Sequence, residues 1–510
     1  MILGRCLARN ARLHPTRLAV IDAAGRRRTY AELHARVNRF ANALLAHGIG
    51  KGARLAVLDR NSIEYLEAYF AAGLIGAWLV PVNFHLKPAD VAYRLQHSNA
   101  NALLVGAEFV PVVRALAREL PPALLGRTWT FEAADDLPSY ESLVAAGGEA
   151  PPDVSIGPED VLYLGYTSGT TGPAKGAMVS HRAIVVGYLY KALDYGLSDA
   201  DVSLCPGPFW HSAPRDFASL AIYLGGTCVV TRGFAPREYF ELAQQHRVTY
   251  SFLVPTMLQM LTSLEDNARY DTASLRVLIS GGSPLPTPVK ERVLERFGPI
   301  LSEFYGATET RIITSITPAE IAERKRSVGR PIRDVELRIL DERGEAVPVG
   351  KPGEIYVRGP GLFSGYHDDP AATQKSHRGD WFSLGDIGRI DADGYLYLVD
   401  RKADMIISAG ENIYPNDIEE VLLTAPGVKE AAVIGIPDPT WGELVTAIVV
   451  PAPSATLDAE TLIAHCAAQL PGYMKPRRVE FADALPRNES GKLLRRVLRE
   501  PYWKGTEANI

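Results

Sequence analysis

The segment Tyr166-Thr-Ser-Gly-Thr-Thr-Gly-Pro-Ala-Lys-Gly176 follows an apolar stretch, Val161 to Leu164, that has the pattern of a buried strand. Its glycines allow backbone N–H groups to face an anion without hindrance from a Cβ atom. Hydroxyl and amine donors are added by Thr167, Ser168, Thr170, Thr171 and Lys175. A polar surface turn is the alternative, but so many donors with one charged residue favour a loop that binds a polyphosphate. It is not a Walker loop, because Lys175 is followed by Gly176 rather than by Ser or Thr.

Helical and strand patterns alternate on both sides of this loop. We expect a helix over Tyr30 to His47, a strand over Arg54 to Leu58, and a helix from Ile63 to Gly73 capped by Asn61 or Ser62. Further strands are predicted at Trp78 to Val82, Thr249 to Val254 and Val277 to Ile279, with a helix from Pro255. This alternation predicts parallel sheets with crossover helices, which place binding loops at the ends of strands.

Beyond about Arg330 the pattern changes to short strands separated by turns. Strands are expected at Val335 to Leu340, Gly353 to Arg358 and Gly394 to Val399, which indicates a β-rich subdomain. After Asp400, two strands (Ala431 to Ile436, Leu444 to Val450) precede a helix begun by Asp458. We therefore predict an α/β protein with a large N-terminal domain (residues 1–400) and a small α+β C-terminal domain (residues 401–510).

Composition excludes several classes of protein. At about 150 residues per domain, the 510 residues predict more than one domain. A net charge of −5 gives no overall field for nucleic acid or an anionic membrane. Arginines interrupt the N-terminus, and glycine and proline interrupt the longest uncharged stretch, Ala68 to Leu86, so neither a signal peptide nor a membrane span is expected. The four widely spaced cysteines suggest no disulfide or zinc site and favour the cytoplasm. A homodimer is left open.

Taken together, five segments resemble the acyl-adenylate-forming superfamily, which includes acyl-CoA synthetases. The loop from Tyr166 is similar to its phosphate loop, and Tyr305-Gly-Ala-Thr-Glu309 to its second core motif. Ser383-Leu-Gly-Asp386 resembles the ribose-binding segment, Asp400-Arg-Lys-Ala-Asp404 the inter-domain linker, and Pro486-Arg-Asn-Glu-Ser-Gly-Lys492 the C-terminal lysine motif. Their order and spacing over nearly the whole chain make the resemblance specific.

The resemblance implies a nucleotide site and a set of catalytic residues. ATP or AMP would be bound by Thr167, Ser168, Gly169, Thr170, Thr171, Gly172, Gly281, Gly282, Ser283, Tyr305, Gly306, Thr308, Asp386 and Arg401. Within this set, Tyr305 would offer its ring to adenine and Asp386 its carboxylate to the ribose hydroxyls. Lys175, Glu309 and Lys492 are the expected catalytic residues, and Glu309 with Thr167 would hold Mg²⁺.

The resemblance also implies a pocket for the acid and a face for coenzyme A. Phe209-Trp210-His211 is similar to the family's element beside the acyl pocket, with Trp210 and His211 as pocket residues. Gly410 and Glu411, in Ser408-Ala-Gly-Glu-Asn-Ile-Tyr-Pro415, would face coenzyme A after the C-terminal domain rotates. Arg215 and Arg311 lie near pocket segments; they either pair with an acidic group on the substrate or are ordinary exposed or salt-bridged arginines.

Two departures from the family pattern stand out. Ala403 occupies the hinge position where relatives usually carry Asp or Lys, and the phosphate loop reads Gly-Pro-Ala-Lys where many have Gly-x-Pro-Lys. Eight basic against three acidic residues between Lys475 and Arg499 surround Lys492, and could also contact the phosphates of coenzyme A.

The sequence therefore predicts an AMP-forming acyl-CoA synthetase that uses ATP, Mg²⁺ and coenzyme A. Two alternatives remain: a ligase that loads a separate carrier protein, and a non-catalytic nucleotide-binding protein. The chain has no G-x-S-x-G elbow, no H-E-x-x-H helix and no Rossmann fingerprint, which argues against hydrolases, zinc peptidases and dinucleotide enzymes. The residues do not distinguish fatty, aryl and branched acids.

Overall fold

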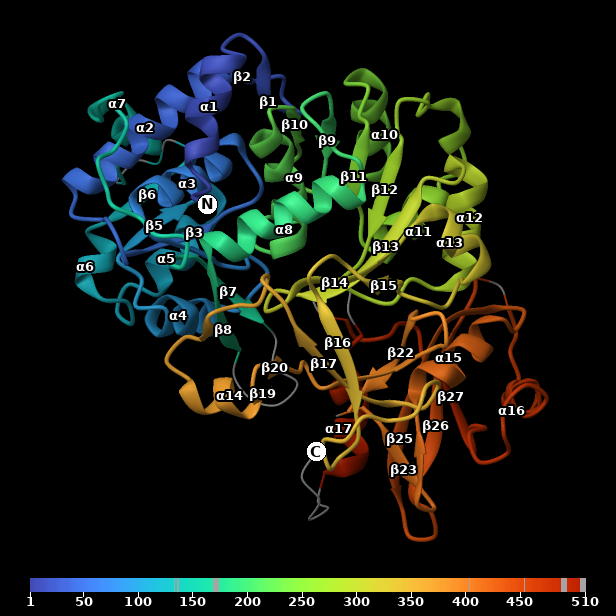
Figure 1. Ribbon diagram of the computed structural model, residues 1–510. Helices are drawn as coiled ribbons and strands as arrows, with labels where there is room; N and C mark the ends of the chain where they lie inside the picture. Colours follow the sequence, from blue (N-terminus) through green and yellow to red (C-terminus); the bar gives the residue numbers. More distant parts are fainter. Residues whose placement is uncertain are drawn as a thin grey trace.

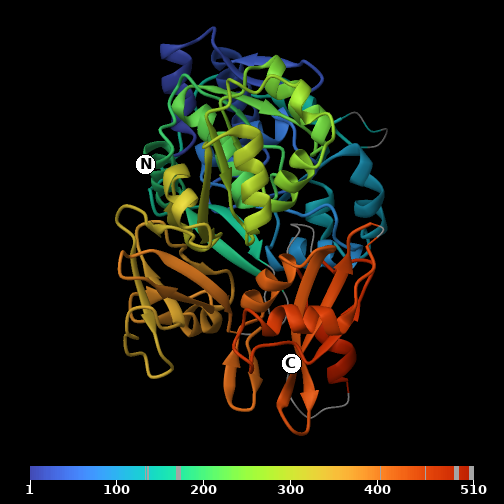
Figure 2. The same ribbon diagram turned by 90° about the vertical axis from the view of Figure 1, so that its right-hand side faces the viewer.

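The structure is a computed structural model that describes residues 1–132, 134, 137–167, 174–402, 404–453, 455–487 and 493–504. The N-terminal part forms the upper body in Figure 1, and the last hundred or so residues, in orange and red, form a smaller body below it. Figure 2 shows the β-rich segment and the C-terminal segment side by side beneath that upper body.

Two large sheets form the N-terminal part of the described chain. The first sheet contains β1 (Leu18–Asp22), β2 (Arg27–Thr29), β9 (Val202–Leu204), β10 (Thr227–Val230), β11 (Tyr250–Phe252), β12 (Val277–Ser280), β13 (Leu301–Ala307), β14 (Arg311–Ile316) and β15 (Arg330–Pro331). The second contains β3 (Arg54–Leu58), β4 (Trp78–Pro81), β5 (Ala102–Val105), β6 (Thr128–Thr130), β7 (Val161–Thr167), β8 (Lys175–Ser180) and β18 (Gly365–Tyr366). Their central strands are parallel, as predicted.

Antiparallel hairpins lie toward the edges of these sheets, beside the predicted parallel strands. β7 pairs with β8 so that Thr167 faces Lys175, and β13 pairs with β14 so that Ala307 faces Arg311. Successive strands joined by a short connection must run antiparallel, because a parallel return needs a long crossover. These two hairpins carry the first two motifs of the sequence.

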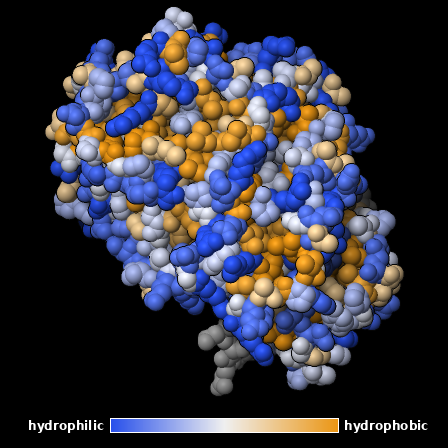
Figure 3. All heavy atoms as spheres, viewed as in Figure 1, coloured by the Kyte–Doolittle hydropathy of each residue, from blue (hydrophilic) through white to orange (hydrophobic). Residues whose placement is uncertain are grey.

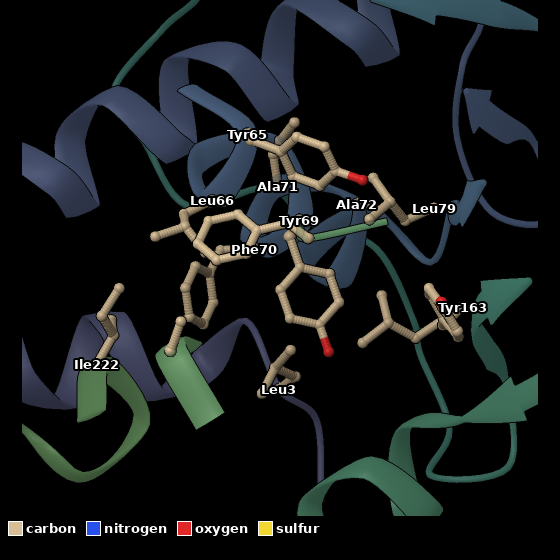
Figure 4. Close-up of a cluster of buried hydrophobic side chains, with 14 of the residues drawn as sticks. Leu3, Tyr65, Leu66, Tyr69, Phe70, Ala71, Ala72, Leu79, Tyr163 and Ile222 are labelled. Carbon is tan, nitrogen blue, oxygen red and sulfur yellow. The ribbon is translucent and has the colours of Figure 1, made fainter. Parts of the chain in front are cut away.

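Helices fill the space around the two sheets. They are α1 (Arg5–Leu13), α2 (Tyr30–Ala46), α3 (Ile63–Ile75), α4 (Pro88–His97), α5 (Val110–Ala115), α6 (Pro122–Leu125), α7 (Tyr140–Ala146), α8 (His181–Asp194), α9 (Ser212–Leu224), α10 (Pro236–Gln245), α11 (Pro255–Thr262), α12 (Thr287–Phe297) and α13 (Pro318–Glu323), with 3-10 turns at Ala107–Phe109 and Asn267–Arg269. The main core joins side chains of α3, α8 and α9 to strands of both sheets. Figure 4 shows part of this packing, with Tyr65, Tyr69 and Phe70 of α3 and Ile222 of α9 in the same cluster.

The predicted β-rich subdomain and C-terminal domain are both present. A third sheet contains β16 (Glu336–Leu340), β17 (Gly353–Arg358), β19 (His377–Arg378), β20 (Trp381–Phe382), β21 (Asp386–Ile390) and β22 (Leu396–Arg401), with α14 (Pro370–Lys375) beside it. The fourth contains β23 (Ile406–Ser408), β24 (Glu411–Ile413), β25 (Val428–Asp438), β26 (Gly442–Pro451) and β27 (Arg478–Phe481), with α15 (Pro415–Leu423), α16 (Ala459–Ala467) and α17 (Arg495–Trp503).

Most predicted elements lie within a few residues of the observed ones. Asp458 caps α16 by accepting from the Thr461 N–H at 2.8 Å, and Ser62 caps α3. The strand expected at Gly394 begins two residues later at Leu396, because Gly394 lies in a turn with φ of 84°. In the described part of the chain, no helix is long and apolar enough to cross a bilayer.

Candidate active site

A cavity of about 730 Å³ brings together side chains from both N-terminal sheets and the β-rich subdomain. Its wall includes the predicted site residues Thr167, Lys175, His211, Gly282, Gly306, Thr308, Glu309 and Arg401. Segments far apart in the sequence thus meet around one space that is large enough for a nucleotide and a small acid.

Glu309 is held at this cavity by two hydroxyl groups. The Thr167 hydroxyl donates to Glu309 Oε1 at 3.1 Å, and the Tyr366 hydroxyl donates to the same oxygen at 3.1 Å. Glu309 is buried, and burial raises the pKa of its carboxyl against the effect of these hydrogen bonds. Lys175 Nζ lies 5.2 Å from the centre of the Tyr366 ring. A carboxylate, a hydroxyl and an ammonium therefore lie at the same end of the cavity.

An irregularity in the pairing of β13 with β14 positions Thr308 and Glu309 at the cavity. The pairing shifts register between Tyr305 and Gly306, and a Cβ atom added at Gly306 would lie 1.9 Å from the Arg311 carbonyl oxygen. Only glycine permits this close approach. The Thr310 hydroxyl accepts from the Ala307 N–H at 3.0 Å and closes the turn. This turn directs Thr308 and Glu309 to the cavity.

Asp386 and Arg401 lie together on neighbouring strands of the β-rich subdomain. The Tyr305 hydroxyl donates to Asp386 Oδ2 at 2.6 Å, and Arg401 Nε lies 3.3 Å from Asp386 Oδ1. Asp386 and Tyr305 are buried, and Tyr305 packs in a cluster with Ile313. At this end the cavity wall is formed by Gly282, Gly385 and Arg401, and φ of 88° at Gly282 favours glycine there.

Another part of the cavity wall is apolar. His211 lines it beside Phe252, Met257 and Phe304. Burial lowers the pKa of His211 to about 3, so its ring is neutral at physiological pH. Asn61 positions this segment: its amide group accepts from the Phe209 N–H at 2.7 Å and donates to the Gly207 carbonyl at 3.0 Å. Asn61, which the sequence offers as a possible helix cap, therefore holds the segment before His211 in position.

Several predicted site residues are not among those that line the cavity. Tyr305, whose ring is expected to face adenine, and Asp386 are buried and hydrogen-bonded to each other, and Ser283 is half-buried. Trp210 packs against His211, with ring centres 3.7 Å apart, and Gly281 lies against the Phe304 ring. Gly410 and Glu411 are exposed on the β23–β24 hairpin of the C-terminal sheet. The remaining predictions lie outside the described residues: Ser168, Gly169, Thr170, Thr171, Gly172, Ala403 and Lys492.

The cavity residues that sequence reasoning missed include Lys191, Ser212 and Tyr366. Ser212 is the first residue of α9, and its hydroxyl lies 3.3 Å from that of Thr308. Lys191 follows Ile184 and Tyr188 at helical spacing on the buried face of α8. A lysine at a position where the pattern predicts an apolar side chain is the sequence signal that could have identified it. Tyr366 belongs to a two-residue strand that only its pairing with β8 defines.

Family models match most of the chain. The AMP-binding enzyme model matches residues 7–367, and the model of the AMP-binding enzyme C-terminal domain matches residues 417–492. The chain belongs to this family, which confirms the resemblance to the acyl-adenylate-forming superfamily and the class of AMP-forming acid–thiol ligases.

Individual relatives are similar over nearly their whole length. A feruloyl-CoA synthase from Amycolatopsis is 39% identical over 98% of this chain and 99% of the relative. The long-chain-fatty-acid–CoA ligase FadD13 of Mycobacterium tuberculosis is 34% identical, with 98% of each chain covered. Among solved structures, ATP-bound MatB from Rhodopseudomonas palustris has a TM-score of 0.89 at 31% identity, covering 98% of this chain and 99% of that one.

Proposed function

We propose that this protein is an ATP-dependent, AMP-forming acyl-CoA synthetase. The observation that carries this proposal is one cavity whose wall contains Thr167, Lys175 and Glu309 together with His211 and apolar side chains such as Phe252 and Met257. A carboxylate oxygen of the acid attacks the α-phosphorus of ATP, the bond to pyrophosphate breaks, and an acyl-adenylate forms. The thiol of coenzyme A then attacks the acyl carbon and AMP leaves.

The first step depends on positioning and on neutralising charge. Lys175, at the end of the phosphate loop, would lie against the leaving phosphates. Arg401 and Asp386 would bind the ribose, and the buried hydrogen bond from Tyr305 would orient the Asp386 carboxylate. Lys492 would neutralise the charge that develops as the carboxylate attacks.

The oxygens of Glu309 and Thr167 fit a magnesium ion. Mg²⁺ prefers hard oxygen ligands, keeps several waters, and is usually shared between one or two carboxylates and the phosphates of a substrate. Among the described residues there is no cluster of three metal-ligating side chains, so ATP would supply further oxygens. When bound, the ion would neutralise phosphate charge; Glu309 would contribute its carboxylate and Thr167 its hydroxyl.

The proposal includes the division into residues 1–400 and 401–510 with a hinge at Ala403. It is supported by the change of sheet between β22, which ends at Arg401, and β23, which begins at Ile406. Rotation about this hinge would bring Gly410 and Glu411 to the cavity for the second step. A cytoplasmic location is also proposed, in keeping with four free, buried cysteines, and a homodimer remains to be tested.

A second acceptor is a carrier-protein thiol. A fatty acid–[acyl-carrier-protein] ligase, ScoC from Streptomyces coeruleorubidus, is 35% identical over 97% of this chain and 95% of that relative. The overall adenylation chemistry is the same for both acceptors, so only the second step distinguishes them.

The test is release of pyrophosphate from ATP with a panel of carboxylic acids, followed by thioester formation with coenzyme A or with a purified acyl carrier protein. We expect release with at least one acid, a thioester with coenzyme A, and a loss of at least 100-fold in Glu309→Gln. Glu336→Gln, which removes an exposed carboxylate on β16, is the matched control. Release of pyrophosphate with thioester only on the carrier protein would favour the second acceptor; no release with any acid would contradict both.

A further inference from the structure

Three buried basic side chains surround one buried carboxylate beside the cavity. Lys191 Nζ of α8 lies 3.3 Å from Asp216 Oδ2, and Arg215 of α9 donates to Asp216 Oδ1 at 2.9 Å. Arg311 of β14 forms an ion pair with the same carboxylate. The most exposed of these four side chains is 4% accessible.

The remaining neighbours do not balance this charge. The Arg215 guanidinium lies 3.8 Å from the ring centre of Tyr163 and 4.8 Å from that of Tyr69, and Lys191 Nζ lies 4.8 Å from the ring centre of Phe217. Figure 4 shows Tyr69 of α3 and Tyr163 of β7 in one cluster of buried side chains. Aromatic faces stabilise cations weakly and carry no net charge.

An excess of positive charge remains even if Lys191 is neutral. Burial, together with the neighbouring guanidinium groups, lowers the pKa of Lys191 well below its ordinary value. Two guanidinium groups then still face one carboxylate, because arginine keeps its proton in proteins. Burying a charge without a partner is costly, so the cluster is suited to an additional anion.

Arg311 is placed to contact that anion. Arg311 and Lys191 both line the cavity. Lys191 lies over the ring of Phe217, which packs against Phe252 and Phe304 of the cavity wall. Within the part of the chain that the structure describes, Arg311 Nε and Nη1 are buried and have no hydrogen-bond partner. These donors lie on a guanidinium whose planar fork matches a carboxylate. Arg311 also has φ of 60°, a left-handed conformation that is unusual for a residue other than glycine.

We propose that the acid activated by this protein carries a second carboxylate, remote from the reacting one, and that Arg311 binds it with Lys191 nearby. The inference rests on the proposed function, since it concerns the same cavity and names the class of acid. A purely apolar acid would leave the Arg311 donors without an acceptor in the closed pocket, which costs binding free energy. Arg311 is thus a specificity-determining residue, and Asp216 holds it in place.

The test compares each dicarboxylic acid with its own monomethyl ester, which has nearly the same shape but one charge fewer. Malonic to sebacic acids and terephthalic acid form the series, and pyrophosphate release is measured with the wild-type protein. We expect kcat/KM for at least one diacid to exceed that of its ester by tenfold or more. In Arg311→Met the preference should fall by at least tenfold, mainly through a higher KM for the diacid, with the KM for ATP unchanged.

Arg237→Met is the matched control, because Arg237 is an exposed arginine of α10 whose ion pair with Asp266 lies on the surface. It should keep the wild-type preference. If Arg311→Met has no cooperative melting transition, two measurements test the inference instead. They are the preference of Lys191→Met for a diacid over its monomethyl ester and the same preference in the wild-type protein.

The outcomes separate the two proposals. Activation of monoacids or esters, with no diacid preferred over its ester, would overturn this inference and leave the proposed function standing. An unchanged preference in a folded Arg311→Met protein would also overturn it. No pyrophosphate release with any acid of either series or of the earlier panel would overturn the proposed function and the inference together.

Discussion

At the scale of single residues, Asp216 is the carboxylate on which three buried basic side chains beside the cavity converge. It is fully buried and is contacted by Lys191, Arg215 and Arg311. Removing one partner of a buried ion pair leaves an uncompensated charge, which costs far more than losing a surface pair.

We therefore predict that Asp216→Asn destabilises the protein by about 3–5 kcal/mol, because three basic groups lose their only carboxylate among the described residues. The free energy of unfolding in urea measures the loss. Asp199→Asn, which removes a half-exposed carboxylate paired with Arg17, should cost less than about 1 kcal/mol. Equal small losses in both variants would mean that the buried cluster does not depend on this charge.

His181 makes stability depend on pH. Its ring is fully buried at the start of α8, Nδ1 accepts from the Leu3 N–H at 3.3 Å, and burial lowers its pKa from 6.5 to about 4. Between these values the unfolded chain binds the proton and the folded chain does not, so stability is lost as pH falls from about 6.5 to about 4.

In His181→Asn this pH-dependent loss, about 3 kcal/mol at most, should disappear. The measurement is the difference in unfolding free energy between wild type and variant at pH 7 and at pH 4.5. The difference isolates His181 from other titrating groups, such as the buried Asp59, whose pKa is raised to about 7. A constant difference over this range would contradict the assignment.

At the scale of elements, the β7–β8 and β13–β14 hairpins place Thr167, Lys175 and Glu309 at the cavity. Motif spacing in the sequence identifies Thr167, Lys175, Glu309 and their loops, because loop function depends on local residue types. The sequence does not reveal that Tyr366 donates to Glu309, since that contact requires a two-residue strand to pair with β8. Nor does it show that Asn61 positions the segment before His211.

Gly306→Ala tests the β13–β14 hairpin. The added Cβ would collide with the backbone carbonyl of Arg311, so we expect a loss of at least about 1–3 kcal/mol in stability and a large loss of pyrophosphate release as Thr308 and Glu309 are displaced. Gly233→Ala is the control, because no heavy atom lies within 4 Å of its added Cβ. A melting temperature and turnover like those of wild type would refute the close approach.

At the scale of the whole molecule, ionic contacts join the C-terminal part to the rest. Arg495 of α17 donates to Glu419 at 2.8 Å and lies 3.6 Å from Asp400 of β22. Arg326 pairs with Asp417 of α15 at 2.9 Å. On the face shown in Figure 3, hydrophilic and hydrophobic residues are intermixed.

Lys492→Ala tests the proposal that the C-terminal domain takes a different position in each step, with Lys492 acting in adenylation but not in thioester formation. We expect adenylation to fall by about 100-fold or more, since a positioned charge is lost, while thioester formation from a supplied acyl-adenylate changes little. Lys504→Ala, an exposed lysine in the same C-terminal part, should alter neither step. Equal losses in both steps would contradict the role assigned to Lys492.

The sequence by itself determined the α/β fold class and the family, and it predicts a phosphate-binding loop after the strand Val161 to Leu164. Those features depend on hydrophobic periodicity, glycine positions and the order of motifs. All of these can be recognised along the chain without knowing which distant residues come into contact. Only the tertiary structure decided that Lys191, Arg215 and Arg311 converge on Asp216. The sequence allows two interpretations of Arg215 and Arg311: they pair with an acidic group on the substrate, or they are ordinary exposed or salt-bridged arginines. Their burial and their charge balance arise only when α8, α9 and β14 pack together.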